Sequence, residues 1–414
     1  MRDRSFDNVV LKNSYYSADI QYSLQMCQWT LKPIGIWPLI YHRVTRREKL
    51  ISVVLLILGF SLLFFILIPS CRFIFFEGHI STKVRLLGPV GYRMSTTVKY
   101  IYLALRGSIF GRCIEHVERD WRTVQDQRHR SIMLECAGLS RKLITMCAAF
   151  LYTGGLSHHT VHAFFSKDRR HSNVTIRPLI YPGYDAFFDT QASPTYEIIY
   201  CMQLLSSLIV YTIGTATYSL LVIFVMHICG QIQIQMARLE NLKNARLENL
   251  KNAGLEKGQR NPLSKIVYNH VEILKFSEKV QKALEEICFT AVVECTINMC
   301  LLQYYCLKSW KASDTVQIVT YITLLMSFTY NIFVFCYIGE VLTEQCSQIG
   351  VASYDIDWYN LPAKNAHDLV LLNIVSQNPP KLLAGRIIEL SLNTFTAVVK
   401  TSVAYMNLLR TVTD

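Results

Sequence analysis

The stretch LISVVLLILGFSLLFFILIP, residues Leu50–Pro69, contains no charged side chain. A membrane-spanning helix needs about 20 mainly apolar residues to cross roughly 30 Å of hydrocarbon, and this stretch meets that requirement without interruption. It is too long for the apolar region of a cleavable signal peptide, so we expect it to act as a signal anchor. The chain is therefore expected to be an integral membrane protein.

Composition agrees with this expectation. Hydrophobic residues make up 51% of the 414 residues and charged residues only 17%, against about 25% charged in an ordinary soluble protein. The net charge of +12 would suggest nucleic acid in a soluble chain, but no basic stretch is interleaved with aromatic residues. We expect a lipid bilayer and no nucleic acid among the partners, and we assign the excess Lys and Arg to cytoplasmic loops.

Six further apolar blocks follow the first one along the chain. Arg93 and Lys99 interrupt the second block, and Glu389 and Lys400 lie in the seventh, so these two depart most from a plain hydropathy pattern. The sequence predicts an all-α polytopic membrane protein with seven transmembrane helices. The six later blocks are Leu86–Leu105, Leu143–Phe164, Tyr196–Ile228, Cys288–Leu307, Val316–Tyr337 and Ile387–Val412.

The orientation follows from the distribution of Lys and Arg. The N-terminal segment and the even-numbered loops contain 29 of these residues, against 10 in the odd-numbered loops and at the C-terminal end. Because cytoplasmic loops collect positive charge, the N-terminus is expected in the cytoplasm and the C-terminus outside. The sequon at Asn173 falls in the third loop, on the predicted outer side, where glycosylation can occur. This orientation is the reverse of a G-protein-coupled receptor.

These patterns divide the chain into four parts. They are a cytoplasmic N-terminal segment (1–49), six transmembrane helices (50–337) with a long cytoplasmic helical loop at 229–287, a cytoplasmic segment (338–386), and a seventh helix with a short outer tail (387–414). The loop contains an eight-residue duplication, Ala237–Asn244 and Ala245–Asn252. Its leucine spacing predicts a lengthened helix, with Glu240 and Lys243 spaced to pair within it, or else a dedicated binding segment.

The sequence carries no recognisable catalytic motif. His158, His159 and His162 cluster at the outer end of the third block, and the first and last are spaced one helical turn apart, as metal ligands can be. No carboxylate or cysteine accompanies them in the sequence, so interfacial residues or the lining of a pocket are the favoured interpretation. We predict no enzyme activity, no cofactor and no metal.

The seventh block is unusually polar for a helix in lipid. Hydroxyl and amide side chains alternate with apolar ones along it, and such residues usually face a bundle interior or water. At about 100° per residue, one face combines Thr401, Tyr405, Leu408 and Thr411. That face is typical of a pore-lining helix with one apolar ring, and equally of a helix packed in the centre of a bundle.

Two stretches show that the chain resembles insect odorant receptors over nearly its whole length. The first enters the fourth block and contains PLIYP at Pro178–Pro182 and PTYEIIY at Pro194–Tyr200. The second is C-terminal and contains SYD at Ser353–Asp355, LAG at Leu383–Gly385, KTS at Lys400–Ser402, and Ala404-Tyr405. The inverted orientation is also that of this family.

The resemblance implies an odorant-tuned subunit of a ligand-gated, non-selective cation channel in the sensory neuron plasma membrane. Such a subunit assembles with a shared co-receptor around one pore, as a heterotetramer, and the segment 338–386 belongs to its cytoplasmic anchor. The motif alignment places the gate at Leu408 and a polar pore residue at Thr411. Lys400 and these two residues differ from the co-receptor pattern. Ala404, Thr411 and Val412 differ from the gustatory receptor pattern, which remains the alternative.

The family places the odorant among the second to sixth spans, and the sequence suggests which residues meet it. We expect a small, mostly apolar volatile ligand, because the outer halves of these spans mix aromatic and aliphatic residues with few polar groups. The same tyrosines and histidine could instead belong to the aromatic belt at the membrane surface. The expected lining is Tyr92, Met94, Tyr152, His159, Tyr200, Leu204, Tyr321 and Leu324.

The orientation can be tested on intact cells. An epitope tag inserted beside Asn173 should bind antibody without permeabilisation, whereas a tag within 237–257 should bind only after it. Surface labelling of the tag in 237–257 would contradict the inverted orientation and would favour a G-protein-coupled receptor arrangement.

Overall fold

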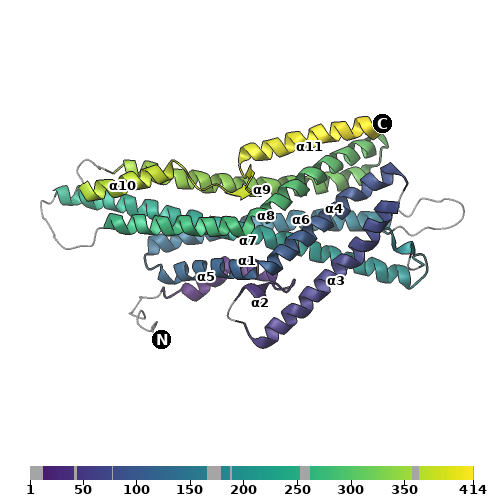
Figure 1. Cartoon of the computed structure of the whole chain (residues 1–414), viewed down its shortest axis with the longest axis horizontal. Coiled ribbons are helices and arrows are strands. Elements are labelled where there is room, and N and C mark those ends of the chain that lie inside the picture. Colours follow the sequence, from purple (N-terminus) through teal and green to yellow (C-terminus); the bar gives the residue numbers. More distant parts are fainter. Residues whose placement is uncertain are drawn as a thin grey trace.

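The computed structural model describes residues 13–41, 44–76, 78–165, 179–186, 189–251, 262–356 and 363–413, which form an elongated bundle of helices (Figure 1). The expected all-α class agrees with this nearly all-helical architecture. The elements are α1 (Tyr16–Leu31), α2 (Trp37–Ile40), α3 (Arg46–Phe76), α4 (Ile80–Leu105), α5 (Gly107–Thr123), α6 (Gln127–Phe165), η2 (Tyr184–Ala186), α7 (Thr195–Lys251), α8 (Pro262–Lys311), α9 (Thr315–Tyr354), α10 (Ala363–Ser376), β1 (Leu383–Ala384), β2 (Ile388–Glu389) and α11 (Leu392–Thr413).

Each of the seven predicted spans coincides with a long helix. The matching helices are α3, α4, α6, α7, α8, α9 and α11. Within the described residues, four of them (α3, α7, α8 and α9) are long and apolar enough by themselves to cross a membrane. The other three carry charged or hydroxyl side chains that weaken the pattern, such as Arg93 and Lys99 in α4. The chain is a helical, multi-pass membrane protein.

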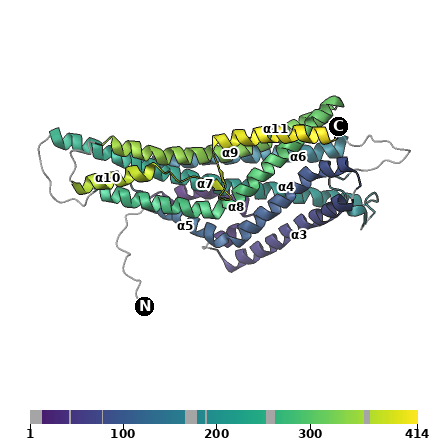
Figure 2. The ribbon, with the colours of Figure 1, turned by 45° about the horizontal axis from the view of Figure 1, so that its top comes forward.

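Four helices, α6, α7, α8 and α9, extend well beyond their predicted spans. α7 contains 57 residues, which at 1.5 Å per residue is about 85 Å, far more than the hydrocarbon thickness. The extensions of α7, α8 and α9 pack with α10 around a small apolar cluster that includes Leu239, Ile349 and Leu372 (Figures 1 and 2). The predicted helix over the duplication is present as far as Lys251, and its continuation lies outside the described residues.

The predicted pairing inside the duplicated helix is wrong. Glu240 pairs with Arg128 of α6 at 2.7 Å, and Lys243 pairs with Asp355 at the end of α9 at 3.0 Å. Neighbouring elements offer these charges partners across the bundle, so the side chains tie α7 to α6 and α9.

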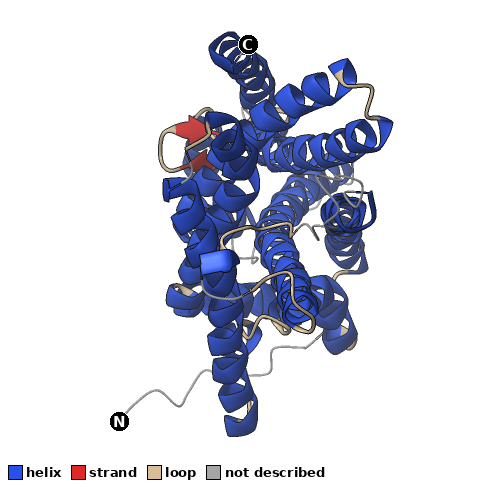
Figure 3. Ribbon diagram, turned by 90° about the vertical axis from the view of Figure 1, so that its right-hand side faces the viewer, coloured by secondary structure: helices blue, strands red, loops and turns tan. Residues whose placement is uncertain are grey.

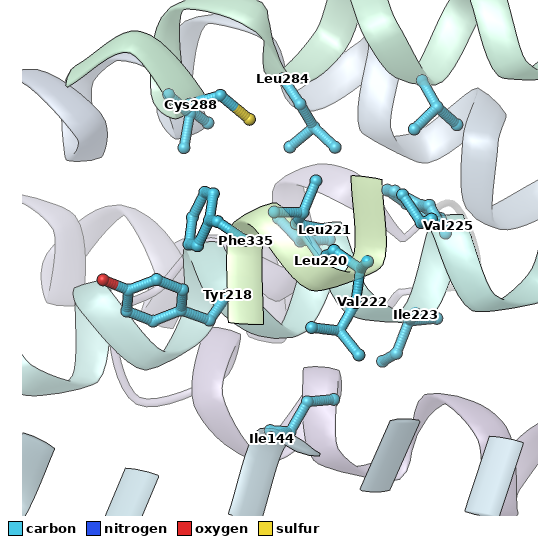
Figure 4. Packing of buried hydrophobic residues seen from close by; sticks show 14 of the residues in the cluster. Ile144, Tyr218, Leu220, Leu221, Val222, Ile223, Val225, Leu284, Cys288 and Phe335 are labelled. Atoms are coloured by element: carbon cyan, nitrogen blue, oxygen red, sulfur yellow. The ribbon is translucent and has the colours of Figure 1, made fainter. Parts of the chain in front are cut away.

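α7 is the central helix of the molecule. In the most apolar 18-residue stretch of α7, 83% is buried, whereas the corresponding share in the peripheral α3 is 28%. Figure 4 shows side chains between Tyr218 and Val225 of α7 packed among Ile144, Leu284 and Phe335 from three other helices. Because hydrocarbon chains are as apolar as these side chains, close packing rather than the hydrophobic effect holds the spans together.

The start of the seventh predicted span needs correction. The prediction begins it at Ile387, but α11 begins at Leu392, because β1 and β2 form a short antiparallel hairpin immediately before it (Figure 3). Gly385 and Arg386 have φ values of 60° and 62°, which turn the chain sharply between the two strands. The hairpin therefore separates the pore-helix candidate from the preceding α10.

The part of α8 beyond its predicted span contains a buried histidine that makes folding sensitive to acid. His270 is only 2% exposed, and burial lowers its pKa from 6.5 to about 4. Between these pKa values the histidine is protonated in the unfolded chain but neutral in the folded one. The contribution of His270 to the free energy of unfolding is therefore complete above pH 6.5 and is lost as the pH drops toward 4. We expect a loss of about 1 kcal/mol between pH 7.5 and pH 5.5.

The measurement is the midpoint of thermal unfolding of the detergent-solubilised protein at these two pH values. His270→Phe should remove this part of the pH dependence, and the exposed control His79→Phe should keep it. Equal acid sensitivity of the wild type and His270→Phe would contradict the prediction.

Candidate functional site

Four helices bring aromatic side chains together within the predicted spans. Tyr152 of α6 shares a hydrogen bond of 2.7 Å with Thr212 of α7, and its ring lies edge-on to Tyr211 at 5.9 Å. Tyr92 of α4 meets Phe328 of α9 edge-on at 5.4 Å. We call these four aromatic residues, together with Thr212, the aromatic cluster. It offers mostly apolar surface with a few hydroxyl groups, which is the chemistry of a site for a small organic ligand.

Close backbone approach makes room for this cluster. A Cβ atom added to Gly155 of α6 would lie 2.1 Å from Cζ of Tyr211, and one added to Gly214 of α7 would lie 2.9 Å from Leu151. Only glycine fits at the first position without displacing the tyrosine ring. The glycines thus let α6 and α7 approach closely enough for their aromatic side chains to interlock.

The described part of the loop before α7 folds inward beside the cluster. Ile180, Tyr181 and Tyr184 are buried. The Gln203 amide donates to the carbonyl oxygen of Tyr181 at 2.9 Å, and the Tyr184 hydroxyl donates to the carbonyl oxygen of Phe65 in α3 at 3.2 Å. These bonds fix the loop between α3 and α7, so it covers one end of the site.

His159 connects this loop to the aromatic cluster. Its side chain is 1% exposed, and its ring lies 6.4 Å from both Tyr181 of the loop and Tyr211 of α7. The histidine therefore belongs to the interior of the bundle rather than to its lipid-facing surface.

Two buried cations on α4 face the same interior. Arg93 is 2% exposed and lies 4.2 Å from the centre of the Tyr181 ring, which places a cation–π contact beneath the loop. Lys99, further along the helix, pairs with Glu294 of α8 at 2.7 Å, and both side chains are almost fully buried. Ser95 also donates a hydrogen bond to the Glu294 carboxylate. The pair holds α4 against α8.

A cavity of about 560 Å³ lies elsewhere, beyond the predicted spans and next to the junction of α5 and α6. Its lining includes Asp120, His129, Arg238 and Lys265. Burial lowers the pKa of both His129 and Arg238. The lining combines the carboxylates Asp120 and Asp126 with the cations Arg238 and Lys265, so it carries both signs of charge and favours no single ligand charge.

α11 packs against its own chain with one face only. Val398 and Ser402 are buried, and the Gln303 amide of α8 donates to the Ser402 hydroxyl at 3.1 Å. Phe395 meets Phe333 of α9 edge-on at 5.5 Å. α8 and α9 therefore hold the helix along the edge of the bundle (Figures 1 and 2).

The opposite face of α11 is turned away from the rest of the chain. Tyr405 is 55% and Leu408 60% exposed, Lys400 and Thr411 are also exposed, and Thr401 is half-buried. This face is available to contact lipid, water or another subunit.

The hairpin fixes the beginning of α11 to α8. Arg386 donates two hydrogen bonds to the Glu285 carboxylate at 2.9 and 3.0 Å, which lowers the pKa of Glu285. The Gly385 amide donates to the Glu285 carbonyl oxygen at 2.9 Å, and Glu389 pairs with Lys381 at 2.8 Å. A displacement of α8 at this point therefore moves the base of α11.

Comparison with known proteins shows which family this chain belongs to. A family model described as 7tm Odorant receptor matches residues 84–403, more than three quarters of the chain. The chain belongs to this odorant receptor family. The resemblance identified from the sequence is thereby confirmed, and the family is one of receptors and not of enzymes.

Individual relatives are distant. The receptor is 23% identical to Odorant receptor 13a of Drosophila melanogaster over 239 residues, 54% of this chain and 56% of that one. It is 25% identical to Odorant receptor 10 of Aedes albopictus over 231 residues, 56% of this chain and 58% of that one. These alignments span little more than half the length of the curated relatives.

The similarity of fold to solved receptors extends over nearly the whole chain. The olfactory receptor OR5 of Machilis hrabei, solved in complex with eugenol, superposes with a TM-score of 0.80 at 15% identity, covering 96% of this chain and all of that one. A second structure of the same OR5 receptor superposes with a TM-score of 0.74 at 15% identity, covering 96% of this chain and 99% of that one.

The structure brings together some of the sequence-predicted lining of this odorant receptor and not the rest. Tyr92, Tyr152 and His159 lie in or against the cluster, whereas Met94 is 57% exposed on the outer side of α4. The other members are half-buried: Tyr200 stacks on Tyr196, Tyr321 lies beside Tyr305, Leu324 faces Gly154, and Leu204 lies on α7. Asn173 lies outside the described residues.

Sequence reasoning missed several residues of the site. Tyr211 and Phe328 carry no signal of their own, because aromatic residues are common in every span, and Tyr181 stood out only as part of the PLIYP stretch before the fourth span. Arg93 did carry one: a cation inside a predicted span has to face the bundle interior or water.

The Lys99–Glu294 pair yields a prediction on stability. Glu294→Gln should leave the buried Lys99 ammonium without a counter-charge and destabilise the receptor by about 3–5 kcal/mol, because a buried charge without its partner is unfavourable. The double variant Lys99→Met with Glu294→Leu should recover most of this loss. The measurement is thermal stability in detergent together with surface expression. A double variant no more stable than Glu294→Gln would contradict the pairing argument.

Proposed function

We propose that this chain is the odorant-binding subunit of a ligand-gated, non-selective cation channel in the plasma membrane. The observation that carries the proposal is the outward face of α11, which combines Thr401, Tyr405, Leu408 and Thr411 in a member of the odorant receptor family. Hydroxyl groups with one apolar ring suit a pore wall that closes by dewetting.

All seven long helices cross the membrane in this proposal, with the N-terminus in the cytoplasm and the C-terminus outside. The charge distribution supports this orientation. The inward placement of Arg93 and Lys99 supports a membrane position for α4, although its pattern is weakly apolar, because cations in lipid have to face the bundle.

The ligand is a small, mostly apolar volatile molecule held at the aromatic cluster. Apolar rings there supply contact area, and Tyr152, Thr212 and His159 supply polar groups that fix its orientation. The OR5 receptor of similar fold, which was solved with eugenol, supports a ligand of this size.

Conduction requires a partner subunit, the co-receptor, in a heterotetramer. Lys400 is exposed on α11 and lies near the proposed pore face, while Glu389 is already paired with Lys381. Four copies of this lysine around one pore would repel cations, whereas co-receptor subunits dilute the charge.

The direct test is current in cells that express the receptor, the co-receptor, or both. A broad panel of volatile odorants should evoke cation current only from the pair. Odorant-gated current from this chain alone, or a surface-expressed pair that stays silent across the panel, would overturn the proposal.

Leu408 provides a test of the gate. Leu408→Ser should raise ligand-independent current, because it places a hydroxyl in the apolar ring, and it should leave the rank order of odorants unchanged. Leu409 is the matched control, since it lies about 100° around α11 on the side that packs against the chain. Equal leak from Leu408→Ser and Leu409→Ser, or a changed odorant ranking, would show that α11 is assigned wrongly.

A further inference from the structure

Arg93 is a buried cation without a compensating anion. Its side chain is 2% exposed, and an arginine guanidinium stays charged in proteins. Across the described ranges, no carboxylate oxygen lies within 4.0 Å of its nitrogens, and the nearby Glu294 is engaged by Lys99. A buried charge of this kind is unfavourable unless it is paired.

The partners that Arg93 does have are neutral. Nη1 donates to the Ser206 hydroxyl at 2.8 Å and Nη2 donates to the Ser207 hydroxyl, while the Tyr181 ring covers one face of the guanidinium. Both serines direct their own protons to backbone carbonyl oxygens, at Leu62 and Gln203 respectively. They therefore present lone pairs to Arg93 but no negative charge.

One nitrogen of the guanidinium makes no hydrogen bond at all among the described residues. Nε is buried and has no hydrogen-bond partner in the described part of the chain. A guanidinium binds a carboxylate through two parallel N–H groups, so a free Nε beside Nη atoms held by neutral hydroxyls suits this geometry.

Arg93 also lies at the aromatic cluster. Its ring partner Tyr181 is 6.4 Å from His159, and the hydroxyl of Ser207 stands one helical turn before Tyr211, within electrostatic reach of the guanidinium. A ligand held by the cluster can therefore extend a polar end toward Arg93.

We propose that Arg93 is a specificity-determining residue that selects odorants with a carboxylate group, that is, small carboxylic acids. The inference rests on the proposed function of the cluster as the odorant site. The apolar tail lies against the aromatic rings, and the carboxylate supplies the negative charge that the site lacks. A neutral carbonyl oxygen accepts the same hydrogen bond without cancelling the charge, so aldehydes and esters bind less well.

The test uses the receptor with its co-receptor and a series of straight-chain carboxylic acids, each with an aldehyde, a methyl ester and a hydrocarbon of matched length. The wild type should respond to acids at the lowest concentrations. Arg93→Gln should raise the half-maximal concentration for acids roughly 10- to 100-fold, as expected for one lost charge-assisted hydrogen bond, and should leave the neutral ligands within about threefold.

Two control variants separate this role from a structural one. Arg93→Lys keeps the charge and should retain a preference for acids over their hydrocarbons. Arg106→Gln removes a cation that pairs with Glu286 outside the site and should change no ranking. Surface expression of each variant is measured, so a loss of all responses through misfolding is recognised, and Arg93→Lys then carries the comparison.

The outcomes distinguish the inference from the proposed function. If neutral odorants open the channel but acids hold no advantage, or if Arg93→Gln weakens acids and hydrocarbons equally, the assignment of Arg93 is overturned while the receptor function stands. If no odorant class opens the wild-type pair, the proposed function itself fails.

Discussion

The rotation of α4 about its axis is set by two cations that cannot face hydrocarbon. Arg93 and Lys99 must both point into the bundle, where one meets Tyr181 and the other meets Glu294. With these two positions directed inward, Tyr92 reaches the space between α7 and α9, and Met94 is carried to the outer surface. The charges that weaken the hydropathy of this helix are therefore what orient its part of the candidate site.

α8 connects this helix to the candidate pore. Glu294 holds Lys99 of α4, Gln303 holds Ser402 of α11, and Glu285 holds the hairpin before α11. These three contacts lie on one continuous helix, and each includes a polar or charged bond. In the proposed function, movement of α4 at the ligand site therefore has a direct mechanical path to the seventh helix, without passing through the closely packed α7.

The sequence was sufficient for the seven long helices, but not for the shorter helices α1, α5 and α10 or for much of the site. Apolar length predicted all seven long helices, since a span has to be about 20 residues whatever it packs against. Position along a span gives depth but not rotation, which is why Met94 was placed with Tyr92. The hairpin at Leu383–Glu389 was missed because strands of two residues have no detectable period. The insertion of Tyr181 rests on Gln203 and Arg93, contacts that exist only once the helices are assembled.

A ligand can shift a channel toward its open state only by binding that state more tightly. In this receptor the candidate site joins helices that differ in burial. α7 is largely buried, and Gly155 of α6 and Gly214 of α7 allow these two helices to pack closely, whereas α4 and α9 are more exposed and meet at Tyr92 and Phe328. In the proposed function, a ligand between the rings changes the separation of α4 and α9 more easily than that of α6 and α7. Since α4 and α9 both pack on α8, and α8 and α9 hold α11, these contacts would carry the change to the proposed pore helix.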